Sequence, residues 1–285
     1  MAIVQPGFIG ILNVYNSSVS STLVRCSSFS VCSNNDPLFY NHVIGLNDTV
    51  PGGYETKGED PGIIQTQRRV FRPSTINISG GISFPATENS LIPFFSYAKY
   101  GNYFDIDFNY YCHEGKHFPD CRVNGFDFNI QAKDILNISV DVISKGPVGT
   151  TSTLGNYDVP EKMITWDRVK ISFANMPFPI DNTIISGLNF KINNNATPIY
   201  VSSFTNNLLP SDIRLGMQEV TGSITVYLKA GYEFIPLALA PATITIDLGF
   251  WSTNIYVVFS ADKLEGLVGP VVTQLPFNGV DKAFG

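Results

Sequence analysis

Charged residues are scarce in this sequence. Only 15% of its 285 residues are Asp, Glu, Lys or Arg, whereas an ordinary soluble domain has roughly 25%. Neutral polar residues take their place, and aromatic residues reach 13%. This composition excludes a disordered chain and a coiled coil, which are rich in charge and poor in aromatic residues. Something must keep such a surface soluble or cover part of it.

Clustered positive charge and long apolar runs are also missing. The formal net charge is -6, which excludes a protein that holds nucleic acid through a basic surface. A protein past which DNA slides without binding is still compatible with this net charge. The longest apolar run, residues 234–242, is broken by Pro236 and Pro241 and is shorter than the roughly 18 residues of a membrane span, so no membrane partner is expected. The N-terminal residues lack a signal-peptide pattern, and the four cysteines are expected to be thiols.

Alternating polar and apolar residues, the pattern of a strand with one buried face, dominate the chain. In residues 220–229, Val220, Ile224 and Val226 share one face, while the other face is polar. The same alternation predicts strands at 76–84, 104–110, 126–130, 138–142, 188–192 and 243–248. Antiparallel sheets with one solvated face have this pattern.

Helices are predicted at two places only. Ser90 as N-cap and Gly101 as C-terminal stop predict a helix over residues 90–100, and residues 261–267 predict a second short one. Two stretches are predicted to be irregular. Residues 45–73 are rich in Pro, Gly and charges of both signs and form a long loop, and residues 145–163 form a linker.

The two halves of the chain resemble each other. The segment FSVCSNNDPLF from Phe29 aligns without gaps on FKINNNATPIY from Phe190, and 190 minus 29 gives an offset of 161. SGGISF around Gly81 resembles TGSITV around Gly222, where the offset is 141, so the first half carries about 20 extra residues in its long loop. Two further blocks follow in the same order: FDIDF at Phe104 against ITIDL at Ile244, and NIQAKDIL at Asn129 against VFSADKLE at Val258. Four blocks in one order favour a duplication.

Three stretches of the second half resemble phage tail tube proteins. They are WDRVKISF at Trp166, SGLNFKINNNATPIYV at Ser186 and DIRLGMQEVTGSITVYL at Asp212. In that family, a strand ending in consecutive asparagines precedes a short loop and a glycine-bearing strand. The first half is similar to the family in ISGGISFPATENSLIPFF at Ile78 and CRVNGFDFNIQ at Cys121. The long charged loop and the Cys/His segment have no counterpart in the pattern.

The resemblance implies a structural protein with no cofactor and no enzymatic activity. The predicted fold is mainly β, with two tandem, similar β-sandwich or half-barrel domains and one or two short helices, contributing strands to an oligomeric β-barrel ring. The domains would span residues 1–144 and 164–285, joined by the linker 145–163. Stacked rings would form a tube through which the viral genome passes without specific binding. With two domains per chain, three chains rather than six would complete a pseudo-sixfold ring.

The resemblance also implies where the protein works and with what. Its partners would be further copies of itself, the tape-measure and terminator proteins and, where the tail has one, the sheath. It would be part of the virion tail after assembly in the host bacterial cytoplasm. The 45–73 loop is expected to reach a neighbouring subunit or ring. Candidate assembly residues are Pro51, Tyr54, Glu59, Asp60, Arg68, Arg69 and Arg72 in this loop, and Asn193, Asn194 and Asn195 in the asparagine run. For the arginines, a solvated loop end is the simpler alternative.

Two groups of residues resemble chemical sites. Cys112, His117 and Cys121 are residue types that bind zinc, but their spacing matches no standard zinc motif, and thiols at a hairpin tip without metal are favoured. Asp105 and Asp107 share a strand face like the paired acids of a glycosidase, although such pairs are common on the wet side of a sheet. No nucleophile–histidine pair can be recognised, so no catalytic residue is expected.

Three other functions fit the same features. A ring protein at the end of a tail, such as a hub or terminator, would share the fold, as would a secretion-system tube of the same ancestry. An adhesin or carbohydrate-binding β-sandwich, a different class, would also present an aromatic surface rich in Asn, Ser and Thr.

Overall fold

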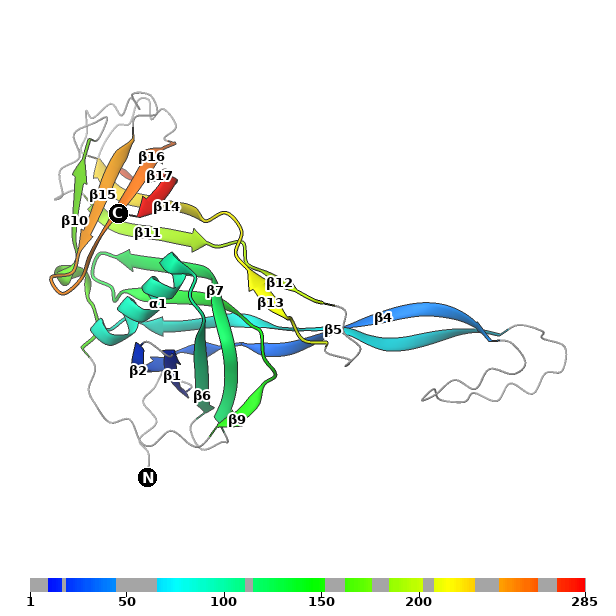
Figure 1. The fold of residues 1–285 in the computed structure, drawn as a ribbon. Helices are drawn as coiled ribbons and strands as arrows, with labels where there is room; N and C mark the ends of the chain where they lie inside the picture. Colours follow the sequence, from blue (N-terminus) through cyan, green and yellow to red (C-terminus); the bar gives the residue numbers. More distant parts are fainter. Residues whose placement is uncertain are drawn as a thin grey trace.

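The chain is mainly β, as predicted. The structure is a computed structural model and describes residues 10–16, 19–44, 66–110, 115–151, 162–175, 185–201, 208–228, 241–260 and 271–284. These residues form a 15-stranded antiparallel sheet, a separate two-stranded sheet and one α-helix (Figure 1). No helix within the described ranges has the length and apolarity needed to cross a membrane.

The strands divide between the two halves. The first half holds β1 (Gly10–Asn16), β2 (Val19–Cys26), β3 (Ser28–Phe29), β4 (Cys32–Ile44), β5 (Thr66–Pro85), β6 (Phe104–Tyr110), β7 (Gly115–Gln131), β8 (Asn137–Ser144) and β9 (Gly149–Thr151). The second half holds β10 (Lys170–Ala174), β11 (Ile185–Asn193), β12 (Thr197–Ile199), β13 (Asp212–Arg214), β14 (Glu219–Leu228), β15 (Ala242–Asp247), β16 (Ser252–Phe259) and β17 (Val271–Phe284), after the single 3-10 turn η1 (Trp166–Arg168). All seven strands predicted from alternation are observed, and five of them coincide with an observed strand or lie within a longer one. The strand predicted over 243–248 ends one residue earlier, at Asp247, and residue 229 of the strand predicted over 220–229 lies outside the described residues.

The order of strands in the first half recurs in the second. In the first half, pairing connects β1, β6, β7, β8, β5 and then β3 with β4. In the second half it connects β10, β15, β16, β17, β14 and then β11. Each strand of one series therefore has a counterpart in the other, in the same order along the sheet.

The register corrects the predicted alignment of the halves by one residue. Phe29 lies opposite Ile82, and Phe190 lies opposite Gly222, so Ile82 and Gly222 are the equivalent positions and the offset is 140. Gly81 was predicted to match Gly222, which is wrong. A slip of one residue turns every side chain to the other face of a strand, and only the even offset places the buried positions on the same face. The offset from Phe104 to Ile244 in the next block is also 140.

The predicted alignment of the last block, residues 129–136 against 258–265, differs from the observed register by more than one residue. Val140 of β8 and Phe277 of β17 are equivalent, because they lie opposite Ile82 and Gly222. Their partners on the other side are Phe126 and Phe259, an offset of 133. The predicted match of residues 129 and 258, an offset of 129, is therefore wrong, because it followed composition rather than pairing.

Helix α1 (Glu88–Tyr100) starts earlier than predicted. Its N-cap is Thr87, whose Oγ1 accepts a hydrogen bond from the Ser90 backbone N–H at 3.3 Å, while Ser90 Oγ accepts one from the Thr87 N–H at 2.9 Å. Ser90 is thus the third helical residue of a capping box rather than the cap itself. Gly101 ends the helix in the left-handed region, with φ of 66°, as predicted. The second predicted helix, residues 261–267, lies outside the described residues.

One hydrophobic cluster contains residues of both halves. The ring of Phe95 on α1 meets Phe126 of β7 at 5.8 Å between centroids and Trp251 of the second half at 4.9 Å. Phe128 of β7 stacks on Phe190 of β11 at 4.8 Å. Edge-to-face and stacked pairs add roughly 0.5–1.5 kcal/mol each beyond area burial. The helix therefore packs against both halves of one continuous sheet, and the division into two domains stays a prediction.

Two segments expected to be irregular contain strands. The loop predicted over residues 45–73 ends earlier, because residues 66–73 belong to β5 and pair with β4. Residues 66–76 of β5 pair only with β4. With their partners on β4 they form a long arm that leaves the body of the molecule (Figure 1). The linker predicted over residues 145–163 contains β9, which pairs with β7. Residues 45–65 and 152–161 lie outside the described part.

The arm has a short counterpart in the second half. Pro37 lies opposite Pro73 near the base of the arm, and Pro198 lies opposite Ile213 in the hairpin of β12 and β13. The offsets are again 161 and 140, so the extra residues of the first half belong to the arm and its tip. This agrees with the predicted place of the insertion.

Candidate assembly surface

One face of the sheet is solvated across both halves, from β8 to β15. Its side chains are mostly neutral and polar, and they include Asn137, Ser139, Asn129, Asn189, Thr221, Ser223, Thr225, Gln274, Asn278, Asn254 and Thr245. Ser83 and Ser139 hydroxyls lie 2.9 Å apart, and Thr245 Oγ1 donates to Asn254 Oδ1 at 2.8 Å. The opposite face holds the buried aromatic residues. We call this solvated surface the polar face; it forms a continuous wall through β7 and β11.

Carboxylates outnumber amines on the central strands of the polar face. The two halves meet where β7 pairs with β11. Across this junction Asp127 of β7 and Lys191 of β11 form an ion pair, with Oδ2 and Nζ 3.6 Å apart. Burial raises the pKa of Asp127, Lys191 opposes this rise, and Asp141 adds to it. Asp141 and Glu219 are exposed. Three carboxylates against one ammonium give the central wall a negative sign, which repels phosphates within a Debye length of about 8–10 Å.

Asn194, a predicted assembly residue, joins the two halves inside the chain. It is 2% exposed, and its Nδ2 donates to the carbonyl oxygens of Ala98 on α1 at 2.9 Å and Val123 on β7 at 3.0 Å. Its Oδ1 accepts from Gln218 Nε2 at 2.8 Å, and its backbone N–H donates to Asn124 O at 2.8 Å. Both amide hydrogens, the amide oxygen and the backbone N–H of this buried residue therefore have hydrogen-bond partners. Sequence reasoning found the asparagine run but not Gln218 or Asn124, which no local pattern marks.

The flanking asparagines shape the turn after β11. Asn193 Nδ2 donates to Asn195 Oδ1 at 3.1 Å, and Asn193 Oδ1 accepts from the Asn195 backbone N–H at 3.1 Å. Asn195 has φ of 47°, a left-handed conformation that asparagine tolerates. Its Nδ2 donates to Met217 O at 2.9 Å. Asn193 is half-buried and Asn195 is exposed, so an assembly role for these two stays a prediction.

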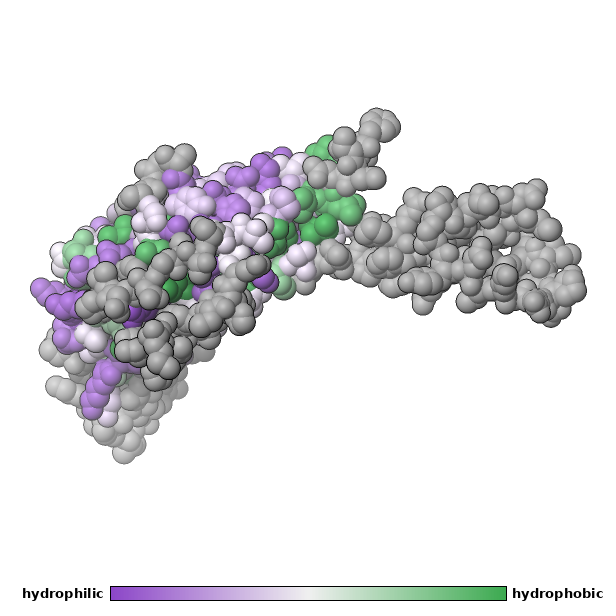
Figure 2. All heavy atoms as spheres, turned by 90° about the horizontal axis from the view of Figure 1, so that it is seen from below, coloured by the Kyte–Doolittle hydropathy of each residue, from purple (hydrophilic) through white to green (hydrophobic). Residues whose placement is uncertain are grey.

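The other predicted assembly residues lie on or beyond the arm. Arg68, Arg69 and Arg72 are placed by their backbone in β5, opposite His42, Asn41 and Leu38 of β4. Pro51, Tyr54, Glu59 and Asp60 lie outside the described residues. Figure 2 shows a body that is largely hydrophilic from below, with hydrophobic side chains gathered toward the side from which the arm leaves. The coloured surface beside the base of the arm is therefore the least polar region in this view.

The candidate metal ligands have other partners. His117 Nδ1 lies 2.7 Å from Asp107 Oδ1, and the buried Cys121 thiol donates to Phe118 O at 3.4 Å. Cys112 lies outside the described residues. Within the part of the chain that is described, no three His, Cys, Asp or Glu side chains are grouped to hold a metal ion.

The paired carboxylates of β6 are also engaged. Besides the contact of Asp107 with His117, Asp105 Oδ1 accepts the backbone N–H of Asp120 at 2.8 Å. Burial, then Asp107 and Asp105, raise the pKa of the nearby Tyr15 to about 12. These contacts tie β6 to β7 and β1, which is a structural role for both acids.

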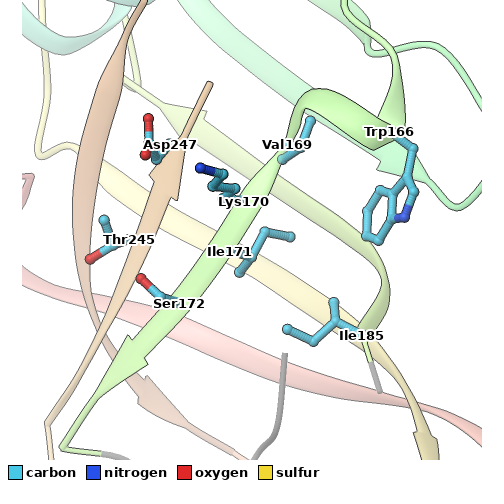
Figure 3. Close-up of a pocket in the computed structure, with 8 residues that line it drawn as sticks. All are labelled: Trp166, Val169, Lys170, Ile171, Ser172, Ile185, Thr245 and Asp247. Atoms are coloured by element: carbon cyan, nitrogen blue, oxygen red, sulfur yellow. The ribbon is translucent and has the colours of Figure 1, made fainter. Parts of the chain in front are cut away.

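A recess of about 580 Å³ lies at the outer edge of the second half, where β10 pairs with β15. Figure 3 shows Trp166, Ile171 and Ile185 on one side of β10, and Lys170, Asp247 and Thr245 on the other. Lys170 and Asp247 are direct cross-strand neighbours. The lining holds no histidine or cysteine.

The geometry defines a structural protein built around a continuous sheet with one packed and one polar face. Residues 65–279 match the family model described as phage tail tube protein. The match covers most of the chain, so the protein belongs to the phage tail tube family, as its sequence resemblance indicated. A comparison with curated proteins finds no match.

Proposed function

We propose that this protein is the building block of a phage tail tube, whose chains assemble into stacked rings around a channel for the viral genome. The observation that supports this most directly is the single antiparallel sheet through both halves, with an aromatic packed face and a neutral polar face. A closed barrel wall with a wet channel needs both faces, and closure removes the open sheet edges that otherwise aggregate.

In this proposal the polar face lines the channel. Neutral side chains give DNA few charges to bind, and the excess of carboxylates on the central strands repels phosphates at short range. The scarcity of charge over the whole chain fits a subunit that neighbours largely cover, because interface centres are depleted in charge and enriched in aromatic residues.

Three chains would complete each ring with pseudo-sixfold symmetry. The matching strand orders of the two halves support this number, because each chain then brings two similar units to the ring. The halves would be two copies of one domain that arose by duplication. The tape-measure, terminator and, where present, sheath proteins would be the further partners in the virion tail, after assembly in the host cytoplasm.

The arm of β4 and β5 would reach a neighbouring subunit or ring. A two-stranded ribbon is marginal in water on its own, so a partner surface would stabilise it. Deleting residues 50–62 is expected to leave folded subunits that do not form tubes, and normal tubes from that variant would contradict the role of the arm. Reversing the charge of Arg68, Arg69 and Arg72 tests whether the basic cluster contributes.

Negative-stain microscopy of the purified protein tests the function. Tubes of stacked rings are the expected result, and the polar face should form the inner wall in a reconstruction. Isolated rings that never stack would favour the hub or terminator alternative. Monomers at all concentrations and salt conditions would contradict a tube-building function.

A further inference from the structure

The hairpin of β12 and β13 belongs to the second half of the chain but is held by the first half. The Tyr103 hydroxyl donates to Asp212 Oδ1 at 2.5 Å, and Arg122 Nη1 donates to Ile213 O at 2.6 Å. The guanidinium group of Arg122 also lies over the ring of Tyr103, 3.9 Å from its centroid. Because the two halves repeat each other, this contact shows how the hairpin of one half docks on the other.

A recess of about 420 Å³ lies where this hairpin meets β5 and β8. Ala196 and Pro198 line it from the hairpin. The Ala196 N–H donates to Asn124 Oδ1 at 2.8 Å, which holds the start of the hairpin to β7. On the sheet, the lining includes four side chains that alternate with core residues: Asn77, Ser79, Asp141 and Ile143.

The matching place in the second half is exposed. By the register of the two halves, the counterparts of these four residues are, in the same order, Met217, Glu219, Asn278 and Val280. Asn193 lies opposite Glu219 as Cys32 lies opposite Ser79, which supports the match. Met217 is 74% exposed and is the most exposed large hydrophobic side chain in the described part of the chain. We call these four residues the 217 surface.

The matching hairpin is the base of the arm. Ala196 and Pro198 stand 161 positions after Asn35 and Pro37, and Pro37 lies opposite Pro73 as Pro198 lies opposite Ile213. The arm leaves the body of its own chain (Figure 1). Since Met217 stays exposed in the single chain, the arm of the same chain does not cover it.

We propose that the 217 surface is a docking site for a second copy of this protein, and that residues 34–37 at the base of the copy's arm occupy it. The inference rests on the proposed assembly into rings and adds which surfaces meet between chains. The contact inside the chain serves as the template, because a closed ring of similar units repeats one contact at every junction.

The two contacts differ in polarity. Asn77 stands at the position of Met217, and the counterpart of Tyr103, at the same offset of 140, is Thr243, whose shorter side chain cannot repeat the bond to the hairpin. The contact within the chain therefore uses hydrogen bonds, whereas the contact between chains relies more on apolar burial at Met217. A charge at position 217 should consequently disturb assembly and spare the fold.

Substitutions at Met217 test the docking site. Met217→Lys is expected to raise the protein concentration needed for ring assembly at least about tenfold, because assembly would bury an unpaired charge at every junction between chains. Lysine is chosen because the arm itself carries arginines, so that no new ion pair with the arm forms. Met217→Leu keeps the apolar contact and should assemble like the parent. Both unassembled variants should melt at the temperature of the parent subunit, since the side chain is exposed there.

Methionine oxidation gives an independent readout on the parent protein. Dilute peroxide should convert Met217 to its sulfoxide rapidly in isolated subunits and at least about tenfold more slowly in rings. Normal assembly of Met217→Lys, or equal oxidation of Met217 in rings and subunits, would overturn the docking site while leaving tube formation intact. A parent protein that forms no rings would instead contradict the proposed function and the docking site with it.

Cross-linking identifies the occupant. In a Cys32→Ser background, the double variant Pro37→Cys, Met217→Cys should be joined from chain to chain by a short bifunctional thiol reagent in rings. Neither single variant should give joined chains. Rings that protect Met217 but yield no cross-link would overturn the arm base as the occupant.

Discussion

Replacing Asn194 with alanine should cost the protein much of its stability. The substitution removes two donated hydrogen bonds, to Ala98 O and Val123 O, and one accepted from Gln218. Each is worth roughly 0.5–1.5 kcal/mol net, with the higher values where a buried partner is left unsatisfied. We therefore expect the free energy of unfolding to fall by about 2–4 kcal/mol.

Urea unfolding followed by far-UV circular dichroism measures this loss. The matched control is Asn193→Ala, one position earlier, whose half-buried amide bonds only to Asn195 among the contacts described. It should cost less than about 1.5 kcal/mol. Because Asn194 ties α1 and β7 to β11, its variant should also unfold over a broader range, as the halves lose their coupling. Equal and small losses for Asn194→Ala and Asn193→Ala would refute the reasoning.

Two further predictions concern the core and the sheet. Burial raises the pKa of Cys26 and Cys121, so at pH 8 these two thiols should stay protonated and should not react with a thiol reagent. Exposed Cys32 should be modified under the same conditions. Peptide mapping that finds all three labelled equally in the folded protein would contradict this prediction. A β-carbon at Gly222 would collide with the backbone of β11, so Gly222→Ala should destabilise the folded protein by about 1–3 kcal/mol, measured by thermal unfolding. Gly149→Ala is the control and should have little effect, because its new carbon would make only ordinary contacts.

Strands with one buried face could be predicted from the sequence, and the arm could not. β14 and β8 alternate because the core lies on one side only, and the pattern survives in the sequence. Residues 66–73 pair only with β4, so no core imposes alternation on them. Their three arginines and Pro73 continue the Pro-, Gly- and charge-rich stretch that begins at residue 45, and the whole stretch resembled a loop. The similarity of the two halves was visible in short blocks. The alignment predicted at the glycine blocks is off by one residue, because glycines match in composition regardless of which face of the strand they occupy.

The joint between the halves needed the structure. The asparagine run was visible, yet the partners of Asn194 lie 71 and 96 positions away, at Val123 and Ala98. Non-local hydrogen bonds of this kind leave no periodic signal in a single sequence. The helix cap shows the same limit at short range: Thr87 and Ser90 are both good capping residues, and only the backbone geometry decides between them.

The number of chains in a ring tests the central claim most directly. A cryo-electron microscopy reconstruction of assembled protein, refined without imposed symmetry, would count the chains and trace the pairing of their strands. Three chains per ring are predicted, with β7 against β11 within each chain. Six chains per ring, each contributing only one of its halves to the wall, would contradict it.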